Sequence, residues 1–244
     1  MQGKDLLHLA EQFGSPLYVY DAEKIQSQYN RLTKAFSKVE TLRINYAMKA
    51  LSNVAILQLL RDMGSGLDTV SIQEVLLGLH AGYAPEKIFF TPNGVSLEEI
   101  EEVAAMGVQI NIDNLSILEQ FGTKYPDTPV CIRINPHVMA GGNTNISVGH
   151  IDSKFGISIH QLPHLLRIVE NTKMHIVGIH MHTGSDILDI EVFLYAAEIL
   201  FDVAKNFKEL EFLDFGSGFK VPYKKDDIET DIEELGKKLS KRFN

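Results

Sequence analysis

Short apolar segments with the composition of buried strands recur at a nearly constant interval along the chain. They begin near Gly66, Lys87, Val108 and Val130, so each start follows the previous one by 21 or 22 residues. This interval holds a strand, a short loop, a helix and a second short loop. Short strands rich in β-branched residues are typical of a parallel sheet that is buried on both faces. The repeat therefore predicts a series of consecutive βα units.

Helix-boundary signals fall between these segments. In a Ser-x-x-Glu capping box, two side chains accept hydrogen bonds from main-chain N–H groups where a helix begins. The pattern occurs as Ser71 with Glu74, Ser96 with Glu99, Ser116 with Glu119 and, in its Gln form, Ser158 with Gln161. Glycine is favoured just past a helix end, where the backbone becomes left-handed. Such helix ends are expected at Gly64, Gly82 and Gly107.

The rest of the chain continues this alternation. Further strands are expected at residues 43–50, which end in Lys49 and Ala50, and at residues 175–182 and 211–218. Further helices are expected at residues 6–13, 22–36, 190–207 and 228–242, the second with Asp21 as its N-cap. Residues 15–21 form a β-rich run, and residues 137–157 form a polar, Gly-rich loop of a kind that is often functional.

Repeated βα units fit either a doubly wound sheet or a (β/α)8 barrel. The barrel normally has eight strands and about 250 residues, which is close to the length of this chain, 244 residues. Only seven strands can be counted from the Lys49 segment onward. We therefore expect one α/β domain over residues 1–244, a (β/α)8 TIM-type barrel truncated before strand eight. Such a truncation would expose two apolar sheet edges.

The composition excludes several kinds of partner. The formal net charge is -9 and no Lys/Arg-rich block occurs, so neither nucleic acid nor an anionic membrane surface is an expected partner. No apolar run approaches the ~20 residues that span a bilayer. The single cysteine, Cys131, allows no intramolecular disulfide and fits a reducing compartment. These features predict a soluble, cytoplasmic protein.

Polar residues occupy the carboxyl ends of the expected strands, where a (β/α)8 enzyme carries its active site. They are Lys49, Asp68, Asn93, Asp113, Arg133, His182, Ser185 and the turn Gly216-Ser217-Gly218. A simpler interpretation makes each one a helix N-cap or a solvated loop residue, and it suits Asn93 and Asp113. It suits Lys49 and Arg133 less well, because a cation is unfavourable at a helix N-terminus.

Two of these features indicate a chemistry. A lysine amine that is desolvated near other cations attacks carbonyl groups and forms a Schiff base, a reaction open to Lys49. The glycines of residues 216–218 allow main-chain N–H groups to approach phosphate oxygens, and Ser185 adds a hydroxyl donor. A lone lysine and a bare Gly-x-Gly turn each more often have only a structural role. The indication of Schiff-base formation and phosphate binding therefore rests on their combination.

His180 and His182 also suggest a metal site. Two residues apart on one strand, they face the same side, and Asp186 or Asp214 could supply a further zinc ligand. Nothing in the spacing requires this arrangement, so no metal site is predicted. A histidine on an apolar strand is most often a core residue with a hydrogen-bond partner, and its flat ring can also stack on a planar cofactor.

Three motifs in the order of the chain resemble one protein family. They are Tyr46-Ala-Met-Lys-Ala50, Ser153-Lys-Phe-Gly-Ile157 and Gly178-Ile-His-Met-His-Thr-Gly-Ser185. The set resembles the pyridoxal phosphate (PLP) decarboxylases with an alanine-racemase-like barrel, and most closely the diaminopimelate decarboxylases. This resemblance implies decarboxylation of meso-2,6-diaminopimelate to L-lysine and CO2, the last step of lysine biosynthesis.

The resemblance implies a role for each matching residue. Lys49 would hold PLP as a Schiff base and His182 would stack on the pyridine ring, so these two are the expected catalytic residues. The phosphate would be bound by Ser185, Gly216, Ser217 and Gly218. Asp68 and Arg133 would line the cofactor pocket. The implied partners are an amino-acid substrate and a second copy of the protein in a homodimer.

The chain departs from the family pattern in three places. The turn at residues 214–218 has fewer glycines than is usual, and residues 143–149 only approximate the usual motif. The Glu-Pro-Gly segment of strand eight, whose glutamate pairs with the pyridine nitrogen in relatives, is expected after Asn244. The family's C-terminal β domain, which residues 17–20 would join and which contributes to the active site of a homodimer, is also expected there.

Other functions remain compatible with these residues. Within the same fold they are a decarboxylase of arginine, ornithine or carboxynorspermidine, and an amino-acid racemase. A catalytically inactive fragment that binds PLP weakly, or that serves only in assembly, belongs to a different class. A zinc-dependent barrel hydrolase is a remote further alternative.

Overall fold

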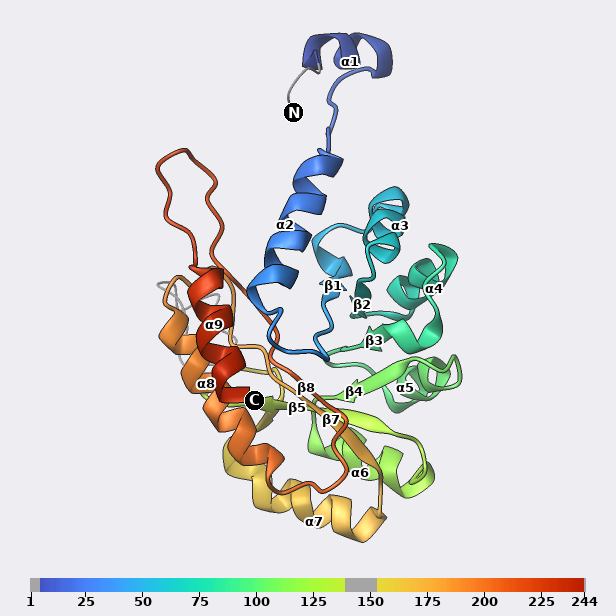
Figure 1. Cartoon of the computed structure of the whole chain (residues 1–244). Helices are drawn as coiled ribbons and strands as arrows, with labels where there is room; N and C mark the ends of the chain where they lie inside the picture. The colour runs from blue at the N-terminus through green and yellow to red at the C-terminus, as the bar shows by residue number, and fades with distance from the viewer. Residues whose placement is uncertain (1–4, 139–152, 244) are drawn as a thin grey trace.

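The computed structural model describes residues 5–138 and 153–243, and its strands form one curled parallel sheet (Figure 1). Along the sheet the strands are β1 (Asn45–Ala47), β2 (Gly66–Thr69), β3 (Ile88–Phe90), β4 (Gln109–Ile112), β5 (Val130–Asn135), β7 (Ile176–His180) and β8 (Phe212–Asp214). The two-residue strand β6 (Ile157–Ser158) pairs with the end of β5 outside this order. A doubly wound sheet reverses its strand order at a switch point. The sequential order therefore confirms the TIM-type fold class.

Helices alternate with the strands and lie outside the curled sheet (Figure 1). They are α1 (Leu6–Phe13), α2 (Ala22–Ala35), α3 (Val54–Asp62), α4 (Ile72–His80), α5 (Leu97–Ala104), α6 (Leu115–Lys124), α7 (Leu162–Thr172), α8 (Ile190–Ala204) and α9 (Ile232–Phe243). Short 3₁₀ turns in the described part of the chain are η1 (Met48–Ala50), η2 (Pro85–Lys87) and η4 (Ile159–Gln161). The expected helices agree with these bounds to within a few residues.

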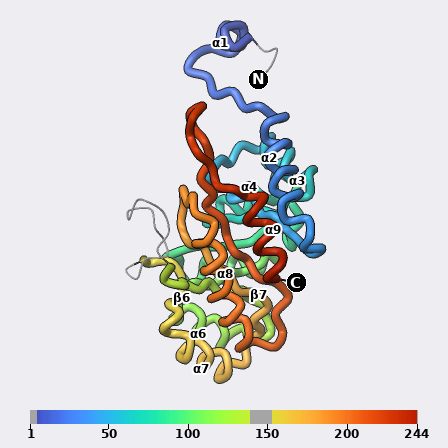
Figure 2. The backbone as a smooth tube through the Cα atoms, turned by 60° about the vertical axis from the view of Figure 1, so that its left-hand side comes forward, coloured from blue at the N-terminus to red at the C-terminus, as the bar shows by residue number. Residues whose placement is uncertain are grey.

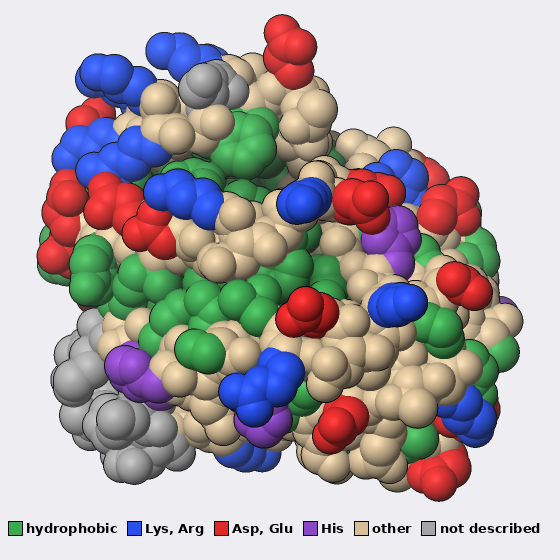
Figure 3. All heavy atoms as spheres, turned by 90° about the horizontal axis from the view of Figure 1, so that it is seen from below, with side chains coloured by type: hydrophobic (Ala, Val, Ile, Leu, Met, Phe, Trp, Pro, Cys, Tyr) green, Lys and Arg blue, Asp and Glu red, His purple; other side chains and the backbone are tan. Residues whose placement is uncertain are grey.

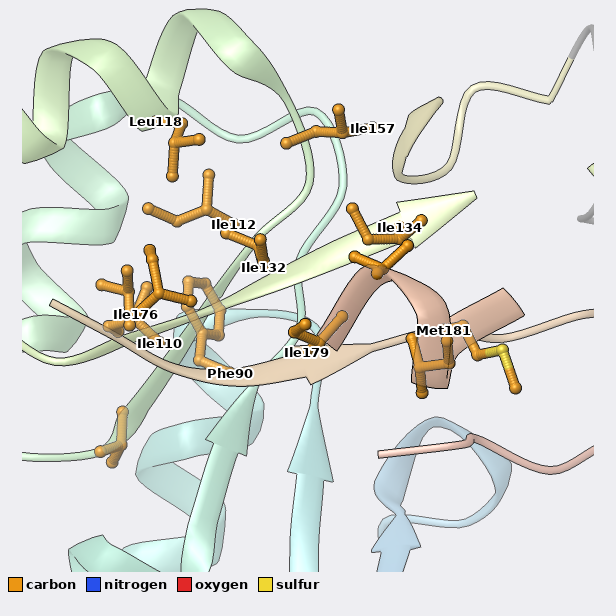
Figure 4. Packing of buried hydrophobic residues seen from close by; sticks show 14 of the residues in the cluster. Phe90, Ile110, Ile112, Leu118, Ile132, Ile134, Ile157, Ile176, Ile179 and Met181 are labelled. Atoms are coloured by element: carbon orange, nitrogen blue, oxygen red, sulfur yellow. The ribbon is translucent and has the colours of Figure 1, made fainter. Parts of the chain in front are cut away.

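The hydrophobic core fills the space between the strands and the helices. Figure 4 shows Phe90, Ile110 and Ile132, from consecutive strands, packed in one cluster with Leu118 of α6. Each fully buried side chain of this size contributes about 1.5–3 kcal/mol relative to exposure. Burial of this layer fixes the strand register, because a one-residue slip would turn every apolar side chain to the wrong face.

Aromatic rings fill part of the inside of the curled sheet. The rings of Phe89 on β3 and Phe212 on β8 meet edge to face, with centroids 5.3 Å apart, although these strands are not neighbours in the sheet. Gly178 on β7 leaves room for the Phe212 ring, because a Cβ at this position would overlap it. This contact ties opposite parts of the sheet together beneath the strand ends.

The predicted helix boundaries are correct in most places. Gly64, Gly82 and Gly107 have φ values of 92°, 87° and 77°, as expected just past helix ends. Ser96 and Glu99 form a complete capping box. At the start of α4, Ser71 accepts from the main-chain N–H of Glu74, whereas the Glu74 carboxylate accepts from Val70 instead. Ser158 caps the 3₁₀ turn η4 and not the start of an α-helix.

One sequence-based expectation is wrong. The box of Ser116 and Glu119 does not form, because α6 begins two residues earlier, at Leu115, with Asn114 as its N-cap. Residues 15–21 form no strand in the described chain, because no neighbouring strand offers them main-chain hydrogen bonds. The Gly-rich part of the predicted loop, together with the whole motif at residues 143–149, falls in 139–152, outside the described residues.

The first and last long helices lie side by side (Figure 2). Arg31 on α2 donates to both carboxylate oxygens of Glu233 on α9, at 2.6 and 2.9 Å, and pairs with Glu229. Gly236 of α9 packs against the main chain at Ala35 of α2. The two ion pairs of Arg31 join residues that are 198 and 202 positions apart in the sequence.

The surface seen in Figure 3 carries Lys and Arg interspersed with Asp and Glu around a strip of hydrophobic side chains, without a continuous basic block on this face. Within residues 5–138 and 153–243, no helix combines the length and hydropathy needed to cross a bilayer.

Replacing Gly236 by alanine is expected to lower the free energy of unfolding by about 1–3 kcal/mol through overpacking. The added methyl group would overlap the main-chain oxygen of Ala35, at a cost that exceeds the ~1 kcal/mol helix propensity gained over glycine. Gly122→Ala in α6 is the matched control, because its nearest neighbours are side-chain atoms of Met174 and Thr172 that can move. Urea unfolding measures both variants, and equal stability would contradict the close contact of α2 with α9.

Candidate active site

Lys49 lies in η1, immediately after β1, at the carboxyl end of the sheet. The strand ends at Ala47, earlier than expected, so Lys49 is carried by a 3₁₀ turn. Its side chain is exposed, and within the described residues no carboxylate lies at ion-pair distance from its ammonium group. The ammonium charge influences the pKa of Asp68, His180 and His182, so these three groups lie around one space near Lys49.

Three charged or titratable residues lie side by side on adjacent strands. Arg133 of β5 is in register with His180 of β7, which is in register with Asp214 of β8. Arg133 is only 7% exposed, and its guanidinium carbon lies 4.9 Å from the ring centroid of Phe155. Within the described residues it forms no ion pair, and burial lowers the pKa of Arg133 despite nearby carboxylates. A buried guanidinium without an ion-pair partner favours a nearby anion.

Both histidines at this end of the sheet are neutral at neutral pH. Burial, together with the nearby Arg133 guanidinium, lowers the pKa of His182 to about 3. Burial and the same cation also lower the pKa of His180. The Nδ1 atom of His180 lies 2.8 Å from Nδ2 of Asn111, so it accepts the amide proton and its own proton sits on Nε2. The uncharged His182 ring is suited to lie against another flat ring.

The two half-buried carboxyl groups of Asp68 and Asp214 have unusual proton affinities. Burial raises the pKa of Asp68 to about 7; the charge of Asp214 adds to the rise, whereas the Thr91 hydroxyl and Lys49 oppose it. Burial also raises the pKa of Asp214, while the Gly216 N–H, which donates to Oδ1 at 2.8 Å, opposes the rise. These carboxyl groups therefore take up protons far more readily than exposed aspartates do.

The glycine turn after β8 lies directly against the loop after β7. Gly216 has φ of 61° and Gly218 has φ of 122°. A Cβ on Gly216 would meet the main-chain oxygen of Met181, and one on Gly218 would overlap the main chain at Gly184. Ser185, whose Cα is 3.3 Å from that position on Gly218, is exposed, as is Ser217. We call the cradle formed by Ser185, Gly216, Ser217 and Gly218 the glycine seat.

The structure corrects the interpretation of Asn93 and Asp113 as helix N-caps. Ser96 and Asn114 cap the helices concerned. Asn93 instead donates to Asp113 at 2.5 Å and to the main-chain oxygen of Lys154 at 3.2 Å. These contacts fasten the segment that carries Phe155 against the ends of β3 and β4.

The sequence analysis missed the buried hydrogen-bonding residues between the predicted ones. Asn111 is 2% exposed and Thr91 is 7% exposed, and the Asn111 amide nitrogen lies 3.5 Å from the Thr91 hydroxyl. Together with Asp68 and His180 they form a polar row inside the sheet. The available signal was the position of Asn111 between two isoleucines of β4 and of Thr91 directly after the apolar strand β3.

Other sites are not indicated in the described part of the chain. No group of three or more His, Cys, Asp or Glu side chains within it could hold a metal ion. A cavity lined by Tyr29, Arg43 and Lys87 lies at the amino ends of the strands, opposite Lys49, and contains none of the predicted site residues.

Comparison with known families agrees with this geometry. Residues 22–244 match the family described as pyridoxal-dependent decarboxylase, pyridoxal binding domain. The chain belongs to this family. As a pyridoxal-binding domain it takes PLP as its cofactor, and the described residues fit that group. The glycines of the seat let the loops after β7 and β8 pack closely, with the exposed Ser185 and Ser217 hydroxyls beside them. Among the described residues no carboxylate pairs with Lys49, and His182 presents an uncharged ring.

Similar proteins include several diaminopimelate decarboxylases. The domain is 37% identical to the one from Methanothermobacter thermautotrophicus over 99% of its own length and 58% of that protein. It is 32% identical to the one from Escherichia coli K12 over 96% of its length and 55% of that protein. A crystal structure of diaminopimelate decarboxylase from Helicobacter pylori complexed with L-lysine is 30% identical, with a TM-score of 0.84, and covers 96% of the domain and 61% of that chain. The domain thus spans little more than half the length of these relatives.

Asp68→Asn is expected to stabilise the domain without added PLP, and to do so more at about pH 8 than at about pH 5. Because folding raises the pKa of Asp68 from 3.8 to about 7, the folded state favours the protonated carboxyl group. The free energy of unfolding therefore falls as the pH rises from about 4 through about 7, and an uncharged amide removes this loss. Urea unfolding at the two pH values measures it, with the exposed Asp226→Asn as control. An equal gain at both pH values would contradict the raised pKa.

Proposed function

We propose that this domain is the cofactor-bearing barrel of a diaminopimelate decarboxylase. The whole protein would convert meso-2,6-diaminopimelate to L-lysine and CO2. The observation that carries the proposal is the exposed Lys49, which has no ion pair among the described residues and shares one end of the sheet with the neutral His182 and the glycine seat. The named relatives supply the substrate assignment.

Each residue has a role that follows from its surroundings. The Lys49 amine would bind PLP covalently, and it is available for this because no carboxylate among the described residues holds its ammonium form in an ion pair. The His182 ring, kept uncharged by burial, would pack flat against the pyridine ring and fix its plane. When bound, PLP supplies an electron-accepting ring that stabilises the negative charge left on Cα after the carboxylate departs.

The glycine seat would hold the phosphate group. Ser185 and Ser217 are exposed and offer hydroxyl donors, and Gly218 allows main-chain atoms to approach the ligand. The N–H of Gly216 already donates to Asp214, so this amide serves the turn itself. The phosphate would then depend on the hydroxyl groups and on the remaining main-chain donors.

Asp68 and Arg133 would line the pocket beneath the cofactor. A pKa of about 7 allows Asp68 to hold or release a proton at neutral pH. The buried Arg133, without an ion-pair partner in the described residues, supplies positive charge to the same space. A carboxylate group of the amino-acid substrate suits this local positive charge.

The proposal extends to the organisation of the whole protein. Residues 1–244 would form the barrel domain, and residues 17–20 would join a sheet in a separate β domain. We further propose a homodimer in the cytoplasm that acts on a free amino acid. The buried Cys131 supports a reducing compartment, and solved relatives complexed with L-lysine support an amino-acid ligand.

Adding PLP to the domain and reducing with borohydride is expected to place a pyridoxyl group on Lys49. Peptide mass mapping identifies the modified lysine. Lys49→Ala should abolish this adduct, whereas Lys87→Ala, at the opposite end of a strand, should leave it unchanged. Labelling spread evenly over surface lysines, and equal in both variants, would contradict the assignment of Lys49.

In the whole protein, Lys49→Ala is expected to reduce release of CO2 from meso-diaminopimelate by more than about a thousandfold, as when a covalent catalytic residue is removed. Lysine and CO2 are both quantified, and arginine and ornithine are offered as competing substrates. Faster decarboxylation of either competitor would contradict the assignment of meso-diaminopimelate as substrate. Racemisation without release of CO2 would contradict the assignment as a decarboxylase.

A further inference from the structure

The segment between β8 and α9 contains one buried hydroxyl in otherwise exposed surroundings. In Figure 1 this segment rises as a long orange-red loop beside α9. Residues 221–229 are exposed, whereas Thr230 is 1% exposed. Most polar side chains that are buried at this level have hydrogen-bond partners. The partners of Thr230 therefore indicate what it holds.

Thr230 joins two loops that are distant in sequence. Its hydroxyl donates to the main-chain oxygen of Ile187 at 2.6 Å and accepts from the main-chain N–H of Lys220 at 2.8 Å. Its own N–H donates to the main-chain oxygen of Lys220 at 3.0 Å. We call Ile187, Lys220 and Thr230 the threonine clip. Both the donor and the acceptor functions of the hydroxyl are used, so the clip fixes the spacing of the two main chains.

The clip lies directly behind the glycine seat. Ile187 comes two residues after Ser185, and Lys220 comes two residues after Gly218. The N–H of Ile187 donates to the main-chain oxygen of Gly218 at 2.9 Å, and the N–H of Lys220 approaches the Ile187 oxygen at 3.2 Å. The two walls of the seat thus run side by side and are closed at one end by Thr230.

A second contact restrains the same loop. Asp186, between Ser185 and Ile187, has φ of 57°, a left-handed conformation uncommon for a residue with a side chain. The ammonium group of Lys220 lies 3.1 Å from its carboxylate. Lys220 therefore holds the Ser185 loop through its side chain, while its own main chain is held by Thr230.

We propose that Thr230 is a positioning residue for the phosphate group of the cofactor. This inference rests on the proposed function, because it requires PLP in the glycine seat. Thr230 itself is part of the clip and not of the seat, and it acts through the separation of the Ser185 and Gly218 loops. Phosphate recognition by main-chain donors depends on their placement, and without the clip the donors no longer converge.

The test compares PLP with pyridoxal, which has the same aldehyde and ring but no phosphate. Thr230→Val keeps the shape of the side chain and removes both hydrogen bonds. It is expected to weaken PLP binding about tenfold, a loss of about 1.4 kcal/mol, and to leave pyridoxal binding unchanged. Titration of the 244-residue chain, followed by visible absorbance, gives both dissociation constants. Thr230→Ser retains the hydroxyl and should restore the affinity for PLP.

Two controls make the result decisive. Thr172→Val removes a threonine hydroxyl that donates to a main-chain oxygen in α7, away from the seat, and should change neither affinity. Ser185→Ala should weaken PLP binding but not pyridoxal binding. If Ser185→Ala has this effect and Thr230→Val does not, the role of Thr230 is overturned while the proposed function stands. Equal weakening of PLP and pyridoxal by Thr230→Val would also overturn it, because a merely structural role predicts that result. Wild-type chain that binds PLP no better than pyridoxal would overturn the phosphate seat itself.

Discussion

Parallel pairing of the strands in the order of the sequence is the constraint on which the rest of the structure depends. Because every strand runs in the same direction, every strand ends at the same edge of the curled sheet. Residues separated by more than 160 positions, such as Lys49 and Asp214, therefore share one space. The apolar layers above and below the sheet hold this register, so the stability of the core also sets the geometry of the candidate active site.

Desolvation changes the protonation of the side chains at this edge of the sheet. Burial favours the neutral forms of His180, His182, Asp68 and Asp214, whereas Arg133 is buried without an ion-pair partner among the described residues. A site with neutral imidazoles, proton-holding carboxyl groups and a desolvated cation suits an anionic ligand. The glycine seat adds a surface made mostly of main chain, and the threonine clip explains why the two loops that form it stay together.

Much of the fold could be predicted because its signals are local. The starts of β2 to β5, the left-handed glycines and the Ser96 capping box depend on a few neighbouring residues. The box at Ser116 was wrong because Asn114, two residues earlier, competes for the same N-cap position. Residues 15–21 have the composition of a strand but form none, because a strand needs a partner that composition cannot supply. The roles predicted for the site residues are expectations that biochemical measurements must test.

The sequence by itself determined the βα repeat, the order of the polar strand ends and the motifs around Lys49 and His182, because each is written in consecutive residues. Only the tertiary structure decided that Asn93 bonds Asp113, that Asn111 holds the proton of His180 on one nitrogen, and that Thr230 joins Ile187 to Lys220. The physical reason is that hydrogen bonds between distant segments depend on the distances that packing imposes. The same packing determines which titratable groups lose water, and therefore which of them change their proton affinity.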